Sequence, residues 1–171
     1  MRWLAWFILA YVALGLQVGL APHLRYHGAA PNLVLLAVVY VGINAPRDAA
    51  LLGGFCLGVV QDLATQQPPG LFALAYGLVA MILVGSHHLT SREHPLTHFA
   101  LALVGGLVTA SVLLIHGWIH PPAPGAGLSV GTEFTRVLYS ALLAPVVIGV
   151  LQRAKKFFAF DSQRRKARPW G

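Results

Sequence analysis

The sequence predicts an all-α membrane protein: a bundle of about six transmembrane helices followed by a short basic tail. Three observations predict this class. The 171 residues are 57% hydrophobic and only 10% charged, whereas a soluble domain is about 25% charged. The apolar residues form runs that approach the roughly 20 residues needed to cross a bilayer. Short polar or Pro- and Gly-rich segments separate these runs and leave no room for a sizeable soluble domain.

The limits of the spans follow from the breaks between apolar runs. The first run is too long for the apolar core of a signal peptide, so we interpret it as a retained helix. Pro31 and Asn32 open the second span, because proline is tolerated in a first helical turn. The segments 66–70 and 121–131 are rich in Pro or Gly and end the third and fifth spans. The predicted membrane domain, residues 1–151, thus has spans at 3–21, 31–44, 49–64, 71–85, 99–118 and 134–151.

The orientation follows from the cationic side chains, which gather on the cytoplasmic side of membrane proteins. Six spans place both termini on one side. Ten of the twelve Lys and Arg residues then share that side, and only Arg25 and Arg136 lie on the other. We therefore expect both termini in the cytoplasm.

The basic tail, residues 152–171, is predicted to be cytoplasmic. A cluster of cations just beyond a spanning helix anchors topology and meets anionic lipid. The net charge of +7 therefore does not indicate a nucleic-acid partner. The expected headgroup contacts are Lys155, Lys156, Arg164, Arg165 and Lys166.

The third span carries a small-residue face, formed by Ala50, Gly54 and Gly58 at intervals of four. Residues four apart lie on nearly the same side of a helix, and small side chains let another helix approach closely in lipid. Two alternatives stay open: this face packs inside the bundle, or it receives the helix of a partner protein. Similar faces occur at Gly15 and Gly19 and at Ala102, Gly106 and Ala110.

Asp62 is the acidic residue set deepest in a predicted span. An ionisable group inside a membrane usually marks a buried pair or a functional site. Arg136 should lie at the same level on the outer side, so we predict an intramembrane pair of Asp62 with Arg136. The alternative is that Asp62 titrates or binds a substrate.

Several chemistries lack their sequence patterns. The phosphate-binding loop and the Gly-x-Ser-x-Gly nucleophile elbow are both missing from the sequence. His94 and His98 are four apart, as are His116 and His120, but we interpret them as solvated interfacial residues rather than metal ligands. We therefore expect no enzyme activity, no catalytic residue, no cofactor and no metal site.

The segment from residue 31 to residue 83 resembles the core of the MreD family of rod shape-determining proteins. Members have a Pro-Asp/Asn start followed by Leu-rich residues, a Gly-rich helix closing on an Asp, and a loop with Pro-x-Gly-x-x-Ala-x-x-Tyr character. This sequence has Asn32 where Asp is frequent. The matching residues include Pro31, Asn32, Asp62, Pro69, Gly70 and Tyr76.

The resemblance implies a non-enzymatic scaffold in the bacterial cytoplasmic (inner) membrane, within the machinery for cell elongation and peptidoglycan synthesis. The implied partners are an MreC-like protein and, through it, MreB and the peptidoglycan synthases. The implied fold is similar to the substrate-binding subunits of energy-coupling-factor vitamin transporters. That similarity supplies the alternative function, a transporter subunit that binds a small molecule.

Polar side chains in the spans distinguish the two functions. A transporter subunit needs polar or aromatic groups that converge on a cavity between helices. Gln17, Asn32, Thr109 and Ser111 look scattered along the chain. Their scatter favours the scaffold.

Overall fold

The computed structural model describes residues 3–25, 28–65, 68–85, 94–120 and 129–153, and these residues form six α-helices without a β-strand. The helices are α1 (Trp3–Gly19), α2 (Leu33–Asn44), α3 (Arg47–Ala64), α4 (Leu71–Gly85), α5 (Pro95–Ile119) and α6 (Val130–Arg153). An all-α fold was expected from the sequence.

α3 begins two residues before its predicted span, and α5 and α6 begin four residues before theirs. α5 starts at Pro95 rather than at residue 99, because proline fits the first turn, where its missing N–H removes no helical hydrogen bond. α6 starts at Val130 rather than at residue 134, and Glu133 lies in its first turn. A carboxylate there is favoured by the helix dipole. The helices therefore reach into segments that the sequence assigned to loops.

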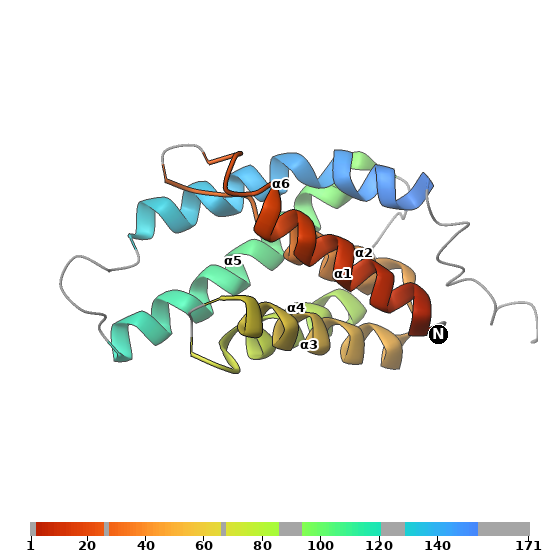
Figure 1. The fold of residues 1–171 in the computed structure, drawn as a ribbon, viewed down its shortest axis with the longest axis horizontal. Helices are drawn as coiled ribbons and strands as arrows, with labels where there is room; N and C mark the ends of the chain where they lie inside the picture. The colour runs from red at the N-terminus through yellow and green to blue at the C-terminus, as the bar shows by residue number, and fades with distance from the viewer. Residues whose placement is uncertain (1–2, 26–27, 66–67, 86–93, 121–128, 154–171) are drawn as a thin grey trace, which may run out of the picture.

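The helices pack around α2. α3 and α4 form one antiparallel pair and α5 and α6 form another, while α2 contacts all five other helices (Figure 1). Every residue of α2 from Leu33 to Ile43 is buried. A helix that is apolar on all sides is stable only when it is enclosed, so the sequence of α2 explains its central place.

The length of α2 has a structural consequence. Its 12 residues span about 18 Å at 1.5 Å per residue, which is less than the roughly 30 Å hydrocarbon core of a bilayer. Backbone that is not helical at membrane depth must be satisfied by protein groups or line a cavity. The ends of α2 therefore need polar partners.

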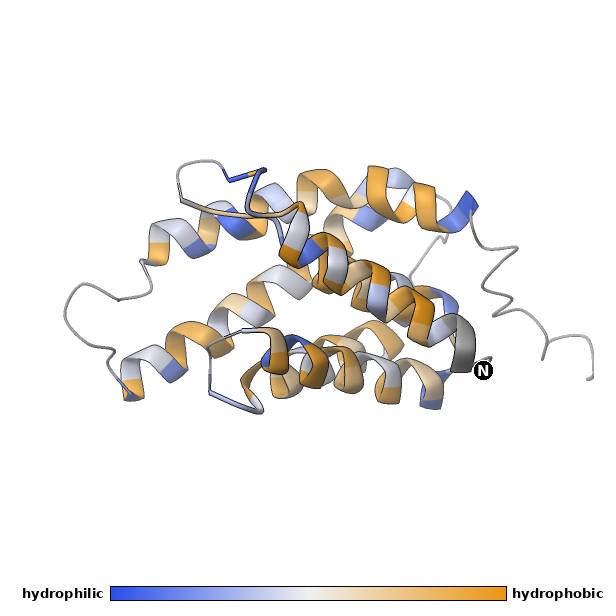
Figure 2. Cartoon of the chain, in the orientation of Figure 1, coloured by the Kyte–Doolittle hydropathy of each residue, from blue (hydrophilic) through white to orange (hydrophobic). Residues whose placement is uncertain are grey.

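Hydrophobic residues make up most of the six helices (Figure 2), and many of them are exposed. Large hydrophobic side chains are exposed on every helix except the enclosed α2, among them Tyr11, Leu63, Met81, Trp118 and Leu142. Such a surface suits lipid rather than water. By length and composition, α5 and α6 can cross a membrane, whereas α1, α2 and α4 are shorter apolar helices.

The two ends of the bundle differ in what they hold. α1 begins and α6 ends at one end, which we call the terminal end (Figure 1). The connections from α1 to α2 and from α3 to α4 lie at the opposite end, which we call the far end (Figure 1). The residues of the predicted family motif gather at the far end.

Candidate functional site

Asp62, near the end of α3, accepts three backbone hydrogen bonds from the start of α4. Its Oδ2 accepts the N–H groups of Gly70 and Ala73 at 3.0 Å each, and its Oδ1 accepts the N–H of Phe72 at 2.9 Å. The first N–H groups of a helix have no partner within the helix. Asp62 is 7% exposed and therefore works as a buried cap that closes the turn between α3 and α4.

The predicted ion pair between Asp62 and Arg136 is not formed. Arg136 instead pairs with Glu133, with 2.9 Å between Arg136 Nη1 and Glu133 Oε1. This contact is an ion pair, and Glu133 Oε1 accepts no hydrogen bond from the described residues. The carboxylate of Asp62 is satisfied eight to eleven residues further along its own chain, so it needs no cation from α6.

Gly70 explains why the turn can close on Asp62. Its φ is +97°, a backbone conformation that glycine adopts without steric cost. Pro69 precedes it, and the Leu71 N–H donates to the carbonyl oxygen of Pro68 at 3.3 Å. The Pro-Gly pair of the family motif thus forms the turn that presents the α4 N–H groups to Asp62.

Asn32 joins three helices at the start of α2. Its Oδ1 accepts the Leu35 N–H and the Tyr76 hydroxyl, each at 3.0 Å, so it caps α2 and holds α4. Its own N–H donates to Ser140 Oγ on α6 at 2.8 Å. The Ser140 hydroxyl donates in turn to the Arg136 carbonyl at 2.7 Å. In both of these side-chain hydrogen bonds Asn32 Oδ1 is the acceptor. A neutral amide oxygen can accept them, so the position does not require the negative charge of an Asp.

Gln17 completes the polar joint from α1. Its Nε2 donates to the Pro31 carbonyl oxygen at 3.2 Å, and its Oε1 accepts the Leu33 N–H at 2.6 Å. This side chain therefore satisfies the backbone on both sides of Asn32. We call Gln17, Asn32, Asp62, Tyr76 and Ser140 the polar joint.

The small-residue face of α3 packs inside the bundle against α4. A Cβ added at Gly58 would lie 2.5 Å from the Cα of Ala73, and one added at Gly54 would lie 2.7 Å from the Cβ of Ala80. Ala50 is fully buried. Of the two alternatives, the structure favours internal packing, because α4 already occupies this face.

The other two small-residue faces differ from each other. A Cβ at Gly106 on α5 would lie 2.8 Å from Val137 Cγ1 on α6, so this face is also internal. Gly15 and Gly19 on α1 have nothing within 4 Å of an added Cβ. They are exposed, so the face of α1 is left without a neighbour in the described part of the chain.

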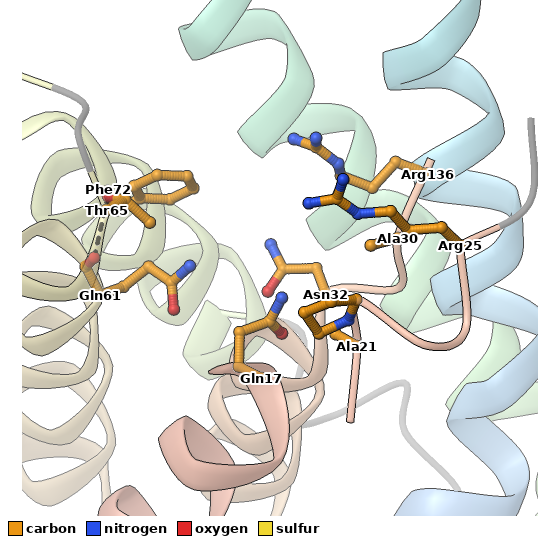
Figure 3. A pocket seen from close by; sticks show the side chains of 10 residues that line it. Gln17, Ala21, Arg25, Ala30, Asn32, Gln61, Thr65, Phe72 and Arg136 are labelled. Carbon is orange, nitrogen blue, oxygen red and sulfur yellow. Dashed lines mark hydrogen bonds between the residues drawn. The ribbon is translucent and has the colours of Figure 1, made fainter. Parts of the chain in front are cut away.

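A polar cavity of about 260 Å³ lies at the far end, beside the polar joint (Figure 3). Gln17 and Asn32 line it together, so these two residues are not scattered as the sequence suggested. Thr109 and Ser111 do not join them, because their hydroxyls donate to Gly105 and Leu107 carbonyls of the same helix. The cavity lining also includes Arg25, Gln61, Thr65, Phe72 and Arg136.

The sequence reasoning overlooked Gln61 and Ser140. Both are polar residues in apolar helices, and that property alone could have marked them. Gln61 precedes Asp62 and is 4% exposed, and its Oε1 has no hydrogen-bond partner among the described residues.

None of the described histidines lines this cavity. In the described residues, no group of three or more His, Cys, Asp or Glu side chains comes close enough to hold a metal ion. The rings of His116 and His120 stack with their centroids 4.7 Å apart, and His98 Nε2 lies 3.1 Å from Gln152 Nε2. The predicted lipid contacts Lys155, Lys156, Arg164, Arg165 and Lys166 lie outside the described residues.

The all-helical bundle, its apolar exterior and its buried polar joint define the class as an α-helical membrane protein. A family model described as rod shape-determining protein MreD matches residues 1–154. The chain therefore belongs to the MreD family, as the resemblance at residues 31–83 indicated. Neither the curated proteins nor the solved structures include a significant match to this chain.

Proposed function

We propose that this protein is a non-enzymatic scaffold of the cell-elongation machinery in the bacterial cytoplasmic membrane. It binds an MreC-like protein and, through it, MreB and the peptidoglycan synthases. Membership of the MreD family carries this proposal, because that family is one of rod shape determination. In the described residues, the buried polar side chains of the joint hold helices together, which suits a structural role.

The proposed membrane arrangement has six spans and cytoplasmic termini. The common end of α1 and α6 (Figure 1) supports it, and so does the cation bias of the sequence. Arg47 and Arg153 belong to the terminal end, whereas Arg25 and Arg136 line the cavity at the far end. The terminal end then faces the cytoplasm and the cavity faces outward.

The partner helix docks on α1 in this proposal. The small-residue face of α3 is occupied by α4, whereas Gly15 and Gly19 of α1 are open. Tyr11 on the same helix is 82% exposed and stands four residues from Gly15, so it can pack along a helix that approaches the glycines. Close approach at small residues is the usual way for helices to associate in lipid.

The first prediction concerns this face. In the double variant Gly15→Leu/Gly19→Leu, the amount of MreC-like partner that co-purifies should fall about tenfold or more, because leucine side chains prevent close approach of the partner helix. Affinity purification from mild detergent with quantitative mass spectrometry measures the loss. The matched control is Gly149→Leu on α6, another glycine with nothing within 4 Å of an added Cβ. Full partner recovery with the double variant would reject docking on α1.

The polar cavity favours a second candidate, the substrate-binding subunit of an energy-coupling-factor type transporter. Gln17, Asn32 and Gln61 converge on it, as a small-molecule site requires. The same purification separates the two functions. Recovery of MreC-like proteins and peptidoglycan synthases supports the scaffold, whereas recovery of a pair of ABC-type ATPases with a membrane coupling subunit supports the transporter.

A further inference from the structure

The wall of the polar cavity carries two guanidinium groups. Arg25 follows α1 and Arg136 belongs to α6, and the two side chains lie next to each other at one side of the cavity (Figure 3). Glu133 pairs with Arg136, but Arg25 makes no ion pair with any described residue. The Asp62 carboxylate is turned onto the N–H groups of α4. This wall therefore has an excess positive charge, and a bound anion would offset the repulsion between the two guanidinium groups.

The opposite side of the cavity offers an amide that lacks a partner. Gln61 extends from α3 into the cavity, across from the two arginines (Figure 3). It is 4% exposed, and its Oε1 has no hydrogen-bond partner in the described part of the chain. A buried acceptor without a donor is costly. The Gln61 Nε2 faces the cavity (Figure 3), where it can donate a hydrogen bond to the oxygen of a ligand hydroxyl.

The size of the cavity limits the ligand. About 260 Å³ is below the roughly 300–1,000 Å³ of pockets that enclose drug-sized molecules. The space suits a small polar group rather than a ring system with a side chain. The guanidinium fork matches the oxygens of both phosphate and carboxylate in geometry and charge. A phosphate monoester has three acceptor oxygens where a carboxylate has two, so it suits a wall with two arginines better.

We propose that this cavity binds a hydroxylated phosphate ester, with the phosphate on Arg25 and Arg136 and a hydroxyl on Gln61. The same chemistry occurs in a soluble ester such as glycerol phosphate and in the headgroup of a phospholipid such as phosphatidylglycerol. The site lies at the far end of an apolar bundle, within reach of both sources. This inference goes beyond the scaffold function and does not depend on it.

The test uses the full chain in nanodiscs and two probes. The soluble probe is glycerol phosphate, titrated at constant ionic strength into phosphatidylcholine nanodiscs while thermal unfolding is followed. The lipid probe is phosphatidylglycerol in mixed nanodiscs, with native mass spectrometry counting retained lipids. Stabilisation by glycerol phosphate identifies the soluble source. Retention of phosphatidylglycerol that depends on Arg25, without a response to the soluble ester, identifies the lipid headgroup.

Arg25 provides the variant, because it is exposed and its replacement should leave the fold intact. Arg25→Gln should weaken binding of the responding probe about tenfold, which corresponds to 1.4 kcal/mol. Arg25→Lys should restore part of the loss, since it keeps the charge but not the fork. The control is Arg153→Gln, which removes one cation from the terminal end of α6 and should change nothing.

Gln61 tests the hydroxyl contact. If the soluble ester binds, wild-type protein should bind glycerol phosphate more tightly than inorganic phosphate, and Gln61→Leu should abolish this preference while phosphate binding remains. If only the lipid binds, Gln61→Leu should abolish a preference for phosphatidylglycerol over phosphatidic acid, which lacks the headgroup hydroxyls. The proposal is overturned if neither glycerol phosphate nor phosphatidylglycerol binds. Equal losses in Arg25→Gln and Arg153→Gln would overturn it as well, because they would show a general effect of surface charge. An unchanged preference in Gln61→Leu would reject the assigned hydroxyl contact.

Discussion

The α3–α4 interface and the polar joint at the far end hold helices together by different physical means. At the interface, Gly54 and Gly58 bring the backbone of α3 against α4, with no space for an added Cβ. At the far end, Asn32, Gln17 and Asp62 satisfy backbone N–H or carbonyl groups at helix ends. A cavity of about 260 Å³ lies beside them.

The difference shows which property of a residue matters at each place. In lipid, van der Waals packing and hydrogen bonds replace the hydrophobic effect as the attraction between helices. A closely packed interface is destabilised by any added side-chain volume. The polar joint tolerates a neighbouring cavity but is destabilised when a hydrogen-bond acceptor is removed. Substitutions should therefore act through size at the interface and through hydrogen-bonding capacity at the far end.

The largest effect is expected for Gly58→Leu. The new Cβ meets backbone atoms of Phe72 and Ala73, which cannot move without separating α3 from α4. Overpacking costs typically about 1–3 kcal/mol and occasionally more, and we expect the upper end or beyond. Thermal unfolding in detergent, followed by fluorescence-detected size exclusion, measures the loss. Gly149→Leu has open space and should match wild type; a Gly58→Leu protein of normal stability would refute the interface argument.

The next effect is expected for Asp62→Ala. Three N–H groups at the buried start of α4 lose their acceptor, and loss of a helix cap costs about 0.5–2 kcal/mol. We expect at least about 2 kcal/mol, because more than one donor is left unpaired. Asp62→Asn should cost less, since the amide oxygen still accepts. Chemical denaturation monitored by circular dichroism gives both values.

A double-mutant cycle tests which partner Asp62 uses. If Asp62 acts only on α4, the combination of Asp62→Asn with Arg136→Gln should show an interaction energy below about 0.5 kcal/mol. A larger interaction energy would support the ion pair between Asp62 and Arg136 that the sequence predicted. It would also contradict capping of α4 as the main role of Asp62.

The smallest effect is expected for Tyr76→Phe. The ring and its packing remain, and only the hydroxyl bond to Asn32 Oδ1 is lost. A single hydrogen bond is worth about 1 kcal/mol. Tyr139→Phe is the control, because that half-buried tyrosine makes no hydrogen bond in the described residues, and it should stay within about 0.5 kcal/mol of wild type. Equal unfolding midpoints for the two variants would show that the joint does not depend on Tyr76.

The polar joint shows how much of the site could be predicted. The family motif includes Pro31, Asn32, Asp62, Gly70 and Tyr76. In the structure, the Tyr76 hydroxyl donates to Asn32 and the Gly70 N–H donates to Asp62. Their bonding could not be predicted, because a motif records order and spacing but not which atoms meet. Ser140 joins Asn32 from 108 residues away, and no local pattern encodes a contact of that range.

The amino-acid sequence by itself determined the membrane class, the all-α fold, the approximate helix positions and the family. It could do so because hydrophobicity, Pro and Gly punctuation and short motifs act along the chain, within one helix or turn. The tertiary structure alone decided that the small-residue face of α3 packs on α4, that Asp62 caps α4, and that Gln17, Asn32 and Gln61 share a cavity. Periodicity tells which residues share a helix face but not which helix that face meets, and that choice is made only when all six helices pack together.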